Sequence, residues 1–179
     1  MKSKKKGFTL VEMIIVLAIM GILLLLLVPS WMNYITKSKI KTQNANSRVI
    51  FNAAQTVAQE YNFSERKEDA AHKFLTKSGP TGSESIYFYW DGSNGKLVDQ
   101  NGNALAGGTA QTAFANNFAR KINNIYDNAD ESIYIIEIKD YIVLNVYSAR
   151  WDGDRYIGSY PNKKKDPSPS TELVKEEFK

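Results

Sequence analysis

Residues 4–29 of the chain read KKKGFTLVEMIIVLAIMGILLLLLVP. From Phe8 to Val28 the run contains only two strongly polar residues, Thr9 and Glu12. An α-helix rises about 1.5 Å per residue, so this run reaches about 31 Å, enough to cross the hydrocarbon core of a bilayer. The stretch therefore predicts a membrane-spanning helix close to the N-terminus.

Two ordinary kinds of segment compete for this run. A secretory signal peptide is disfavoured because the run is long and ends in Val28-Pro29-Ser30-Trp31, which lacks a small-residue cleavage site. A plain single-span anchor stays possible. For such an anchor Glu12 is unfavourable, since a carboxylate costs about 2.5–3.5 kcal/mol at the bilayer centre and less near the helix end.

The start of the run resembles the class III leader and cleavage site of type IV prepilins and pseudopilins. In that family a short basic leader ends in Gly, a hydrophobic residue (usually Phe) follows, and Glu stands at the fifth position of the mature chain. Gly7, Phe8 and Glu12 match this pattern, and Pro29 falls where pilins commonly carry a helix-loosening proline. The resemblance covers residues 1 to about 60 and is specific enough to favour a prepilin over a plain anchor.

The resemblance implies how the N-terminus is processed. A prepilin peptidase cuts between Gly7 and Phe8 at the cytoplasmic face and methylates the new amine of Phe8. A carboxylate in apolar surroundings needs a charged or hydrogen-bonding partner. In this family the proposed partner of Glu12 is the N-terminal ammonium of a neighbouring subunit, which sets the axial register. Pairing of Glu12 with its own N-terminus or helix donors is the alternative, and the two can coexist.

The resemblance also assigns Gly21 and Pro29 to assembly. Proline removes a helical hydrogen bond, and glycine weakens a helix by up to about 1 kcal/mol relative to alanine. Family members often lose helical structure between such positions when they pack in filaments. For the unassembled protein we expect a kinked but continuous helix.

Charge is distributed unevenly along the chain. Four of the 23 basic residues, Lys2, Lys4, Lys5 and Lys6, precede Gly7, so residues 8–179 carry 19 basic and 19 acidic residues. The basic bias belongs to the leader, which argues against nucleic acid as a partner of the folded domain. The positive-inside rule favours a cytoplasmic N-terminus. The number of basic residues does not differ between the two sides of the span, because four cations also follow it: Lys37, Lys39, Lys41 and Arg48.

Beyond the span the sequence predicts an α+β protein: a long N-terminal helix laid against a small antiparallel sheet, like a ladle. We divide it into a cleaved leader (1–7), a hydrophobic helix (8–28), its amphipathic continuation (29–62), a head (63–160) and a tail (161–179) that is mobile or wrapped on the surface. The apolar stripe of the continuation consists of Ile40, Val49, Ile50, Ala53, Ala54, Val57 and Tyr61. Its Asn, Ser and Gln residues are predicted to face solvent or another subunit.

Within the head, periodicity and turn residues predict the other elements. Residues 62–85 form a connecting loop with one short helix over 68–77. Residues 110–126 form a second helix with Phe114, Phe118, Ile122 and Ile125 on its apolar face. The strands are expected at 86–90, 96–98, 132–138, 141–151 and 155–160, with turns at 91–95, 139–140 and 152–154. One face of the sheet packs on the long helix and the other is partly exposed.

No catalytic constellation is evident, so the sequence predicts neither an enzyme nor a cofactor. His72 is the single histidine, there is no cysteine, and no glycine-rich phosphate loop is present. The acidic segments 91–95, 127–131 and 152–154 leave a calcium site open, although none has EF-hand spacing. The aromatic residues 87–90 suit a sugar platform or, as we favour, the packing of a sheet.

The resulting hypothesis is a structural subunit of a type IV pilus that supports adhesion, twitching motility or aggregation. The alternative is a minor pilin or pseudopilin of a type II secretion or DNA-uptake (competence) machine. The implied partners are other copies in a helical filament, prepilin peptidase, assembly platform proteins and, before assembly, the lipid bilayer. The subunit would span the cytoplasmic membrane once and then become extracellular. Many pilins carry a C-terminal disulfide loop, which this cysteine-free chain lacks.

Overall fold

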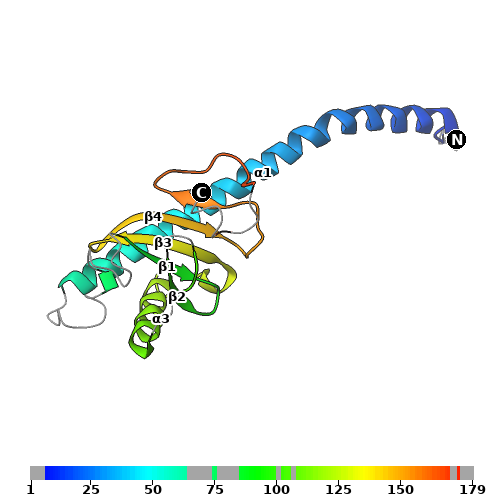
Figure 1. Ribbon diagram of the computed structural model, residues 1–179. Helices are drawn as coiled ribbons and strands as arrows, with labels where there is room; N and C mark the ends of the chain where they lie inside the picture. The colour runs from blue at the N-terminus through cyan, green and yellow to red at the C-terminus, as the bar shows by residue number, and fades with distance from the viewer. Residues whose placement is uncertain are drawn as a thin grey trace, which may run out of the picture.

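A computed structural model describes residues 7–63, 74–75, 85–99, 102–105, 108–169 and 173. Its elements are the helices α1 (Leu10–Phe63) and α3 (Thr109–Asn123), a 3₁₀ turn (Ala129–Glu131), and the strands β1 (Ile86–Trp90), β2 (Gly95–Val98), β3 (Ile133–Lys139), β4 (Ile142–Ala149) and β5 (Gly158–Tyr160). Figure 1 shows one long helix whose second half lies against the sheet while its first half projects from the head. This architecture confirms the predicted α+β fold class.

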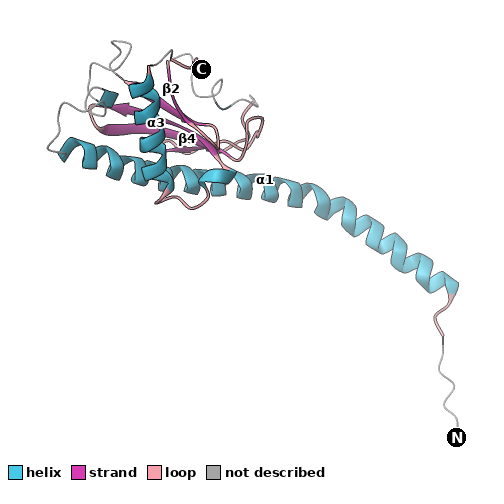
Figure 2. Cartoon of the chain, turned by 90° about the horizontal axis from the view of Figure 1, so that it is seen from below, coloured by secondary structure: helices cyan, strands magenta, loops and turns pink. Residues whose placement is uncertain are grey.

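The helix α1 runs without a break through Pro29. It bends gradually along its projecting half, as Figure 2 shows. In its second half Ile40, Ile50, Ala54 and Val57 are buried against the head, which confirms most of the predicted stripe. Val49 does not belong to this stripe, because its side chain is 44% exposed and lies beside the contact face.

The sheet has the strand order β2-β1-β3-β4-β5, and every neighbouring pair is antiparallel. On one face, β4 and β5 pack on α1 and β2 packs on α3, around a core that includes Phe88, Phe118 and Tyr134. On the other face, Ile133 and Ile135 form a smaller cluster. Aromatic residues thus alternate between the two faces, as predicted, with Phe88 and Trp90 in the main core.

The structure corrects several predicted boundaries. The turn between β3 and β4 is formed by Asp140 and Tyr141, one residue later than predicted, and both have positive φ (51° and 62°). Such paired left-handed residues match the twist of a two-residue hairpin. The strand β4 ends at Ala149 rather than at residue 151.

The fifth strand and the second helix are also shorter than predicted. Residues 150–157 form a loop in which Asp154 is buried and accepts a hydrogen bond from the backbone N–H of Tyr156 (3.0 Å), so β5 begins only at Gly158. The helix α3 ends at Asn123. Ile125 therefore leaves the predicted apolar face and is 49% exposed, while Tyr126 is buried in its place.

Parts of two further segments are described. Phe74 and Leu75 are helical and buried, whereas the rest of the predicted short helix and His72 lie outside the described residues. In the C-terminal segment, the N–H of Ser168 donates to the carbonyl of Arg155 (2.8 Å), and Leu173 is buried in the smaller cluster. These residues of the segment that we expected to be mobile or surface-wrapped are thus held against the head.

The strand β5 approaches α1 so closely that a side chain does not fit between them. A Cβ atom added to Gly158 would lie 2.1 Å and 2.2 Å from the carbonyl carbon and oxygen of Gln43, and 2.5 Å from the N of Asn44. These neighbours are helix backbone, which cannot rotate away. Gly158 therefore sets the distance between the sheet edge and the helix.

We expect Gly158→Ala to destabilise the head by about 1–3 kcal/mol, because β5 and α1 must separate to accept the methyl group. The measurement is urea unfolding of the full chain in detergent, followed by tryptophan fluorescence. Gly21→Ala is the control, since nothing lies within 4 Å of the added Cβ. Equal unfolding midpoints for both variants would contradict the close packing.

Candidate assembly site

The N-terminus of α1 is capped by three reciprocal hydrogen bonds between Thr9 and Glu12. The Glu12 carboxylate oxygen Oε2 accepts from the backbone N–H and from the hydroxyl of Thr9, both at 2.8 Å. The N–H of Glu12 in turn donates to the Thr9 Oγ1 at 3.3 Å. This is a capping box, in which the acid at the third helical position supports the residue that caps the helix. In the uncut chain one carboxylate oxygen of Glu12, Oε2, is therefore satisfied by its own helix.

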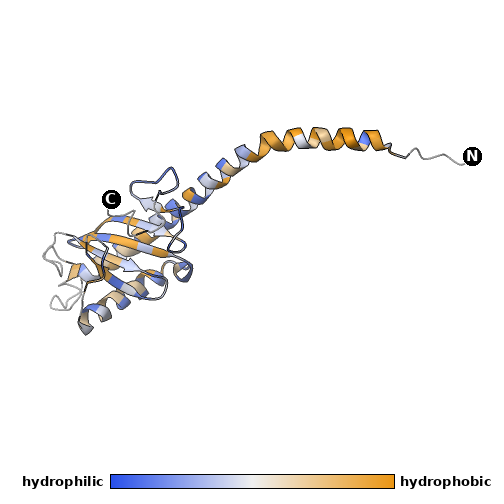
Figure 3. Ribbon diagram, turned by 45° about the vertical axis from the view of Figure 1, so that its right-hand side comes forward, coloured by the Kyte–Doolittle hydropathy of each residue, from blue (hydrophilic) through white to orange (hydrophobic). Residues whose placement is uncertain are grey.

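The projecting half of α1 has no cover within the described residues. Its apolar side chains are exposed at successive positions along the helix, and Figure 3 shows this arm coloured hydrophobic along most of its length. Leu25 is 77% and Leu26 is 70% exposed, and the space around Gly21 is open. In the described part of the chain α1 is the one helix with the length and apolar composition needed to cross a bilayer. An arm of this kind requires lipid or other protein around it.

The contact between α1 and the head contains a polar seam that we define as Asn44, Ser47 and Gln55. Asn44 forms its centre: its Oδ1 accepts from the N–H of Ser159 (2.9 Å) and of Lys164 (3.2 Å), and its Nδ2 donates to the Lys164 carbonyl (2.7 Å). One carboxamide thus satisfies the backbone of the last strand and of the segment that follows it.

The other two members bind the neighbouring strand. The hydroxyls of Ser47 and Ser148 are 2.8 Å apart in a buried contact. Gln55 donates to the carbonyl of Tyr141 (3.0 Å) and accepts from the N–H of Val143 (2.9 Å). These side chains replace the hydrogen bonds that the backbone groups would otherwise make with water, which removes the cost of burying them.

The prediction that the polar residues of this helix face solvent or another subunit is wrong for the seam. Asn44 and Ser47 are 7% and 0% exposed. The sequence did contain a signal that these positions face the head. Asn44 lies four residues after Ile40, and Ser47 lies three residues after Asn44 and seven before Ala54. The apolar stripe therefore continues through both polar positions.

The acidic turn at 91–95 uses the carboxylate of Asp91 within the protein. Asp91 accepts hydrogen bonds from the N–H groups of Ser93 (3.0 Å) and Asn94 (2.7 Å) and pairs with Lys96 (2.5 Å). Partial burial raises the pKa of Asp91, but Lys96 and these donors outweigh it and hold the pKa below its usual range. Among the described residues no group of three His, Asp or Glu side chains could hold a metal ion.

The aromatic strand residues serve the sheet. Phe88 is fully buried and packs edge-on against Phe118, with ring centroids 5.2 Å apart. Trp90 is 7% exposed, and its indole N–H donates to the carbonyl of Ala129 (3.0 Å). These two rings are therefore occupied by core contacts rather than offered to a ligand.

We expect Asn44→Ala to release the segment around Ser159 and Lys164, because their backbone N–H groups lose a shared acceptor. Loss of a buried hydrogen-bonding group costs about 1–3 kcal/mol. Hydrogen–deuterium exchange of the full chain in detergent should then show faster exchange of peptides covering residues 158–165. Asn52→Ala, an exposed position on the same helix, is the control. Unchanged protection in Asn44→Ala would show that the carboxamide does not hold this segment.

Comparison with known proteins finds a family that matches the N-terminus and individual relatives that match much of the chain. The family described as the prokaryotic N-terminal methylation motif matches residues 2–28. The type IV major fimbrial protein FimA of Dichelobacter nodosus is 31% identical over 132 residues, which cover 69% of this chain and 79% of that protein. The competence protein ComGC of Streptococcus pneumoniae is 33% identical over 104 residues, 55% of this chain and 92% of that protein. No solved structure matches significantly.

Proposed function

Because this chain belongs to the type IV pilin family, we propose that it is a structural, non-enzymatic subunit of a type IV pilus, assembled through the exposed half of α1. The observation that carries this proposal is the arm of residues 8–28, in which only Thr9 and Glu12 are strongly polar and which is uncovered in the single subunit. Packed copies of the same arm would cover one another and form the centre of a filament. The polar head would then face outward, where it would support adhesion, motility or aggregation.

We propose that processing occurs between Gly7 and Phe8, which lie within the residues 2–28 that the methylation motif matches. Gly7 and Phe8 are exposed ahead of the first turn of α1, and the side chain of Phe8 is 77% exposed. A peptidase at the cytoplasmic face could therefore reach the bond without unfolding the helix. Cutting there removes the leader lysines and leaves a cationic amine two residues before the helix begins.

The capping box suggests how Glu12 would act during assembly. In the uncut chain Glu12 accepts two hydrogen bonds from Thr9, and both end on Oε2. Oε1 is left for a further donor, and we propose that this donor is the Phe8 ammonium of a neighbouring subunit. Such a pair would fix the axial position of one subunit against the next, because a carboxylate in apolar surroundings is costly without a cation. Gly21 and Pro29 would let the helix adjust as the arms pack.

The alternative is a subunit of a DNA-uptake or type II secretion machine. The similarity to ComGC supports it, because the match spans nearly the whole of that shorter protein. Both roles would use the same membrane-inserted precursor and the same cut. They differ in where the processed protein accumulates.

The test is intact-mass and N-terminal analysis of two fractions, filaments sheared from the cells and the membranes that remain. A dominant species beginning at N-methylated Phe8 in the sheared fraction would support a major pilin. The same species confined to membranes would favour the alternative. An uncut chain in cells with active prepilin peptidase would contradict both proposals and leave a plain membrane anchor.

We expect Glu12→Ala to insert into the membrane normally but to lose filaments, because the neighbouring ammonium has no carboxylate to meet. Sheared filaments should fall at least tenfold by quantitative immunoblot, with the membrane pool unchanged. Glu60→Ala is the matched control: it removes a carboxylate from the same helix, where Glu60 is exposed and pairs with Lys121. Normal piliation in Glu12→Ala would contradict the register role.

A further inference from the structure

Basic side chains gather where α1 leaves the head. We define a basic collar as Lys37, Lys39, Lys41, Arg150, Arg155, Lys163, Lys164 and Lys165. The acidic residues in the same segments are Asp152, Asp154 and Asp166, and Asp154 is already paired with Arg150 (3.4 Å). Because residues 8–179 carry as many acidic as basic residues, the rest of the chain has an acidic excess. The charge is therefore segregated on a protein that is neutral as a whole.

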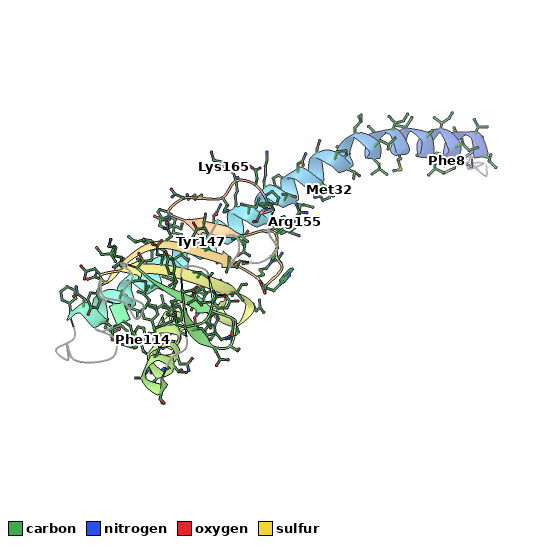
Figure 4. The ribbon with its side chains drawn as sticks, in the orientation of Figure 1. Phe8, Met32, Phe114, Tyr147, Arg155 and Lys165 are labelled. Atoms are coloured by element: carbon green, nitrogen blue, oxygen red, sulfur yellow. The ribbon has the colours of Figure 1, made fainter. Side chains whose placement is uncertain are left out.

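Contacts between elements bring these residues together. The Lys39 ammonium lies 4.7 Å from the centre of the Tyr156 ring, next to Arg155 in the chain. Lys39 and Arg150 also line one small cavity of about 160 Å³. The backbone of Lys164 is held by Asn44 of the same helix. Figure 4 shows Arg155 and Lys165 beside α1, at the end of the head that is nearer to Met32 and the projecting arm.

The order of residues along α1 places the collar relative to a membrane. The apolar run ends at Val28, and Trp31 and Tyr34 follow with 67% and 73% of their surfaces exposed. Exposed Trp and Tyr residues just beyond a span are typical of the membrane–water interface. Lys37 comes nine residues after Val28, about 14 Å farther along the helix. The headgroup layer is about 5–7 Å thick, so the collar begins about one Debye length (~8 Å) above it.

We propose that, in the unassembled subunit, the basic collar binds anionic phospholipid headgroups on the outer surface of the membrane and holds the head down on the bilayer. This inference rests on the membrane-inserted subunit of the proposed function. It explains why four cations follow the span as well as precede it: those after the span belong to a folded surface, three of them in the collar. Extraction into a filament would then have to break these contacts.

A lipid surface fits the collar better than a second copy of the chain does. The cations belong to α1 and to two loops beside it, and Figure 4 shows Arg155 and Lys165 of these loops near the point where the arm leaves the head. For a vertical span this end of the head lies over the bilayer. Juxtamembrane basic clusters are attracted to anionic headgroups with roughly a fivefold gain in affinity for each cation near the surface.

The test measures how close the head lies to lipid of different charge. The chain has no cysteine, so Asn162→Cys, at an exposed position beside the collar, accepts a single donor dye. The full chain is reconstituted in nanodiscs of phosphatidylcholine, with or without phosphatidylglycerol, that contain an acceptor-labelled lipid headgroup. We expect phosphatidylglycerol to raise energy transfer, and 1 M salt, where the Debye length is about 3 Å, to abolish the gain.

The variant is Lys37→Gln with Lys41→Gln, two exposed collar residues one helical turn apart at the end nearest the bilayer, which should lower the lipid-bound fraction relative to the free one by roughly 25-fold at low salt, a factor of about five for each cation. Arg48→Gln with Arg120→Gln is the matched control: it removes two exposed cations outside the collar and should keep the gain. Equal transfer in both lipids, or an equal loss in the control, would overturn the proposal. A collar variant that loses filaments but keeps the same energy transfer would also overturn the proposal, because the collar would then bind a second copy of the chain.

Carbonate extraction of the same chain separates this inference from the proposed function. A chain that resists extraction but shows no dependence on lipid charge would overturn the collar alone. A chain that carbonate extracts would overturn the membrane-inserted subunit and the collar together.

Discussion

An α-helix that is apolar on all sides cannot remain in water, and the first half of α1 is such a helix. Burial of apolar surface is worth about 25 cal/mol per Å², and side chains such as Leu25 and Leu26 are more than two-thirds exposed in the single subunit. The head cannot cover this arm, because its sheet packs on the second half of the same helix. The apolar surface of the arm is therefore buried only when the chain lies within a bilayer or packs against other copies. A pilin-type subunit that moves from one environment to the other meets this requirement twice.

In the proposed passage from bilayer to filament, the head would have to move together with the helix. The structure achieves this with two kinds of contact. Apolar residues such as Ile50 and Val57 supply buried area, whereas Asn44 and Gln55 bind strand backbone and fix the position of the head along the helix. Gly158 brings β5 directly onto the helix backbone. Apolar packing alone tolerates small sliding movements, while directional hydrogen bonds do not. Force applied to the arm would thus reach the head without a flexible joint.

The two proposals concern opposite ends of one axis. At the cytoplasmic end, cleavage after Gly7 would expose the amine that Glu12 is proposed to meet in a neighbour. At the outer end, the basic collar is proposed to meet lipid headgroups. Both are electrostatic interactions at the borders of an apolar segment, where charge is less costly than at its centre. Together they would define the height of the subunit in the membrane before assembly. The relatives FimA and ComGC leave open which kind of filament follows.

The sequence by itself determined the arm, the motif of Gly7, Phe8 and Glu12, and the α+β class. These depend on local pattern: a long apolar run, a motif of fixed spacing, and strands with clear alternation. It placed Phe114 and Phe118 in the core correctly but misplaced Ile125, because the end of a helix depends on what lies beyond it. It also took Asn44 and Ser47 for solvent-facing residues. Only the tertiary structure decided their role, since their partners, Ser159, Lys164 and Ser148, lie more than a hundred residues away. The basic collar has the same origin, because its charges come from three segments that meet only when the chain folds.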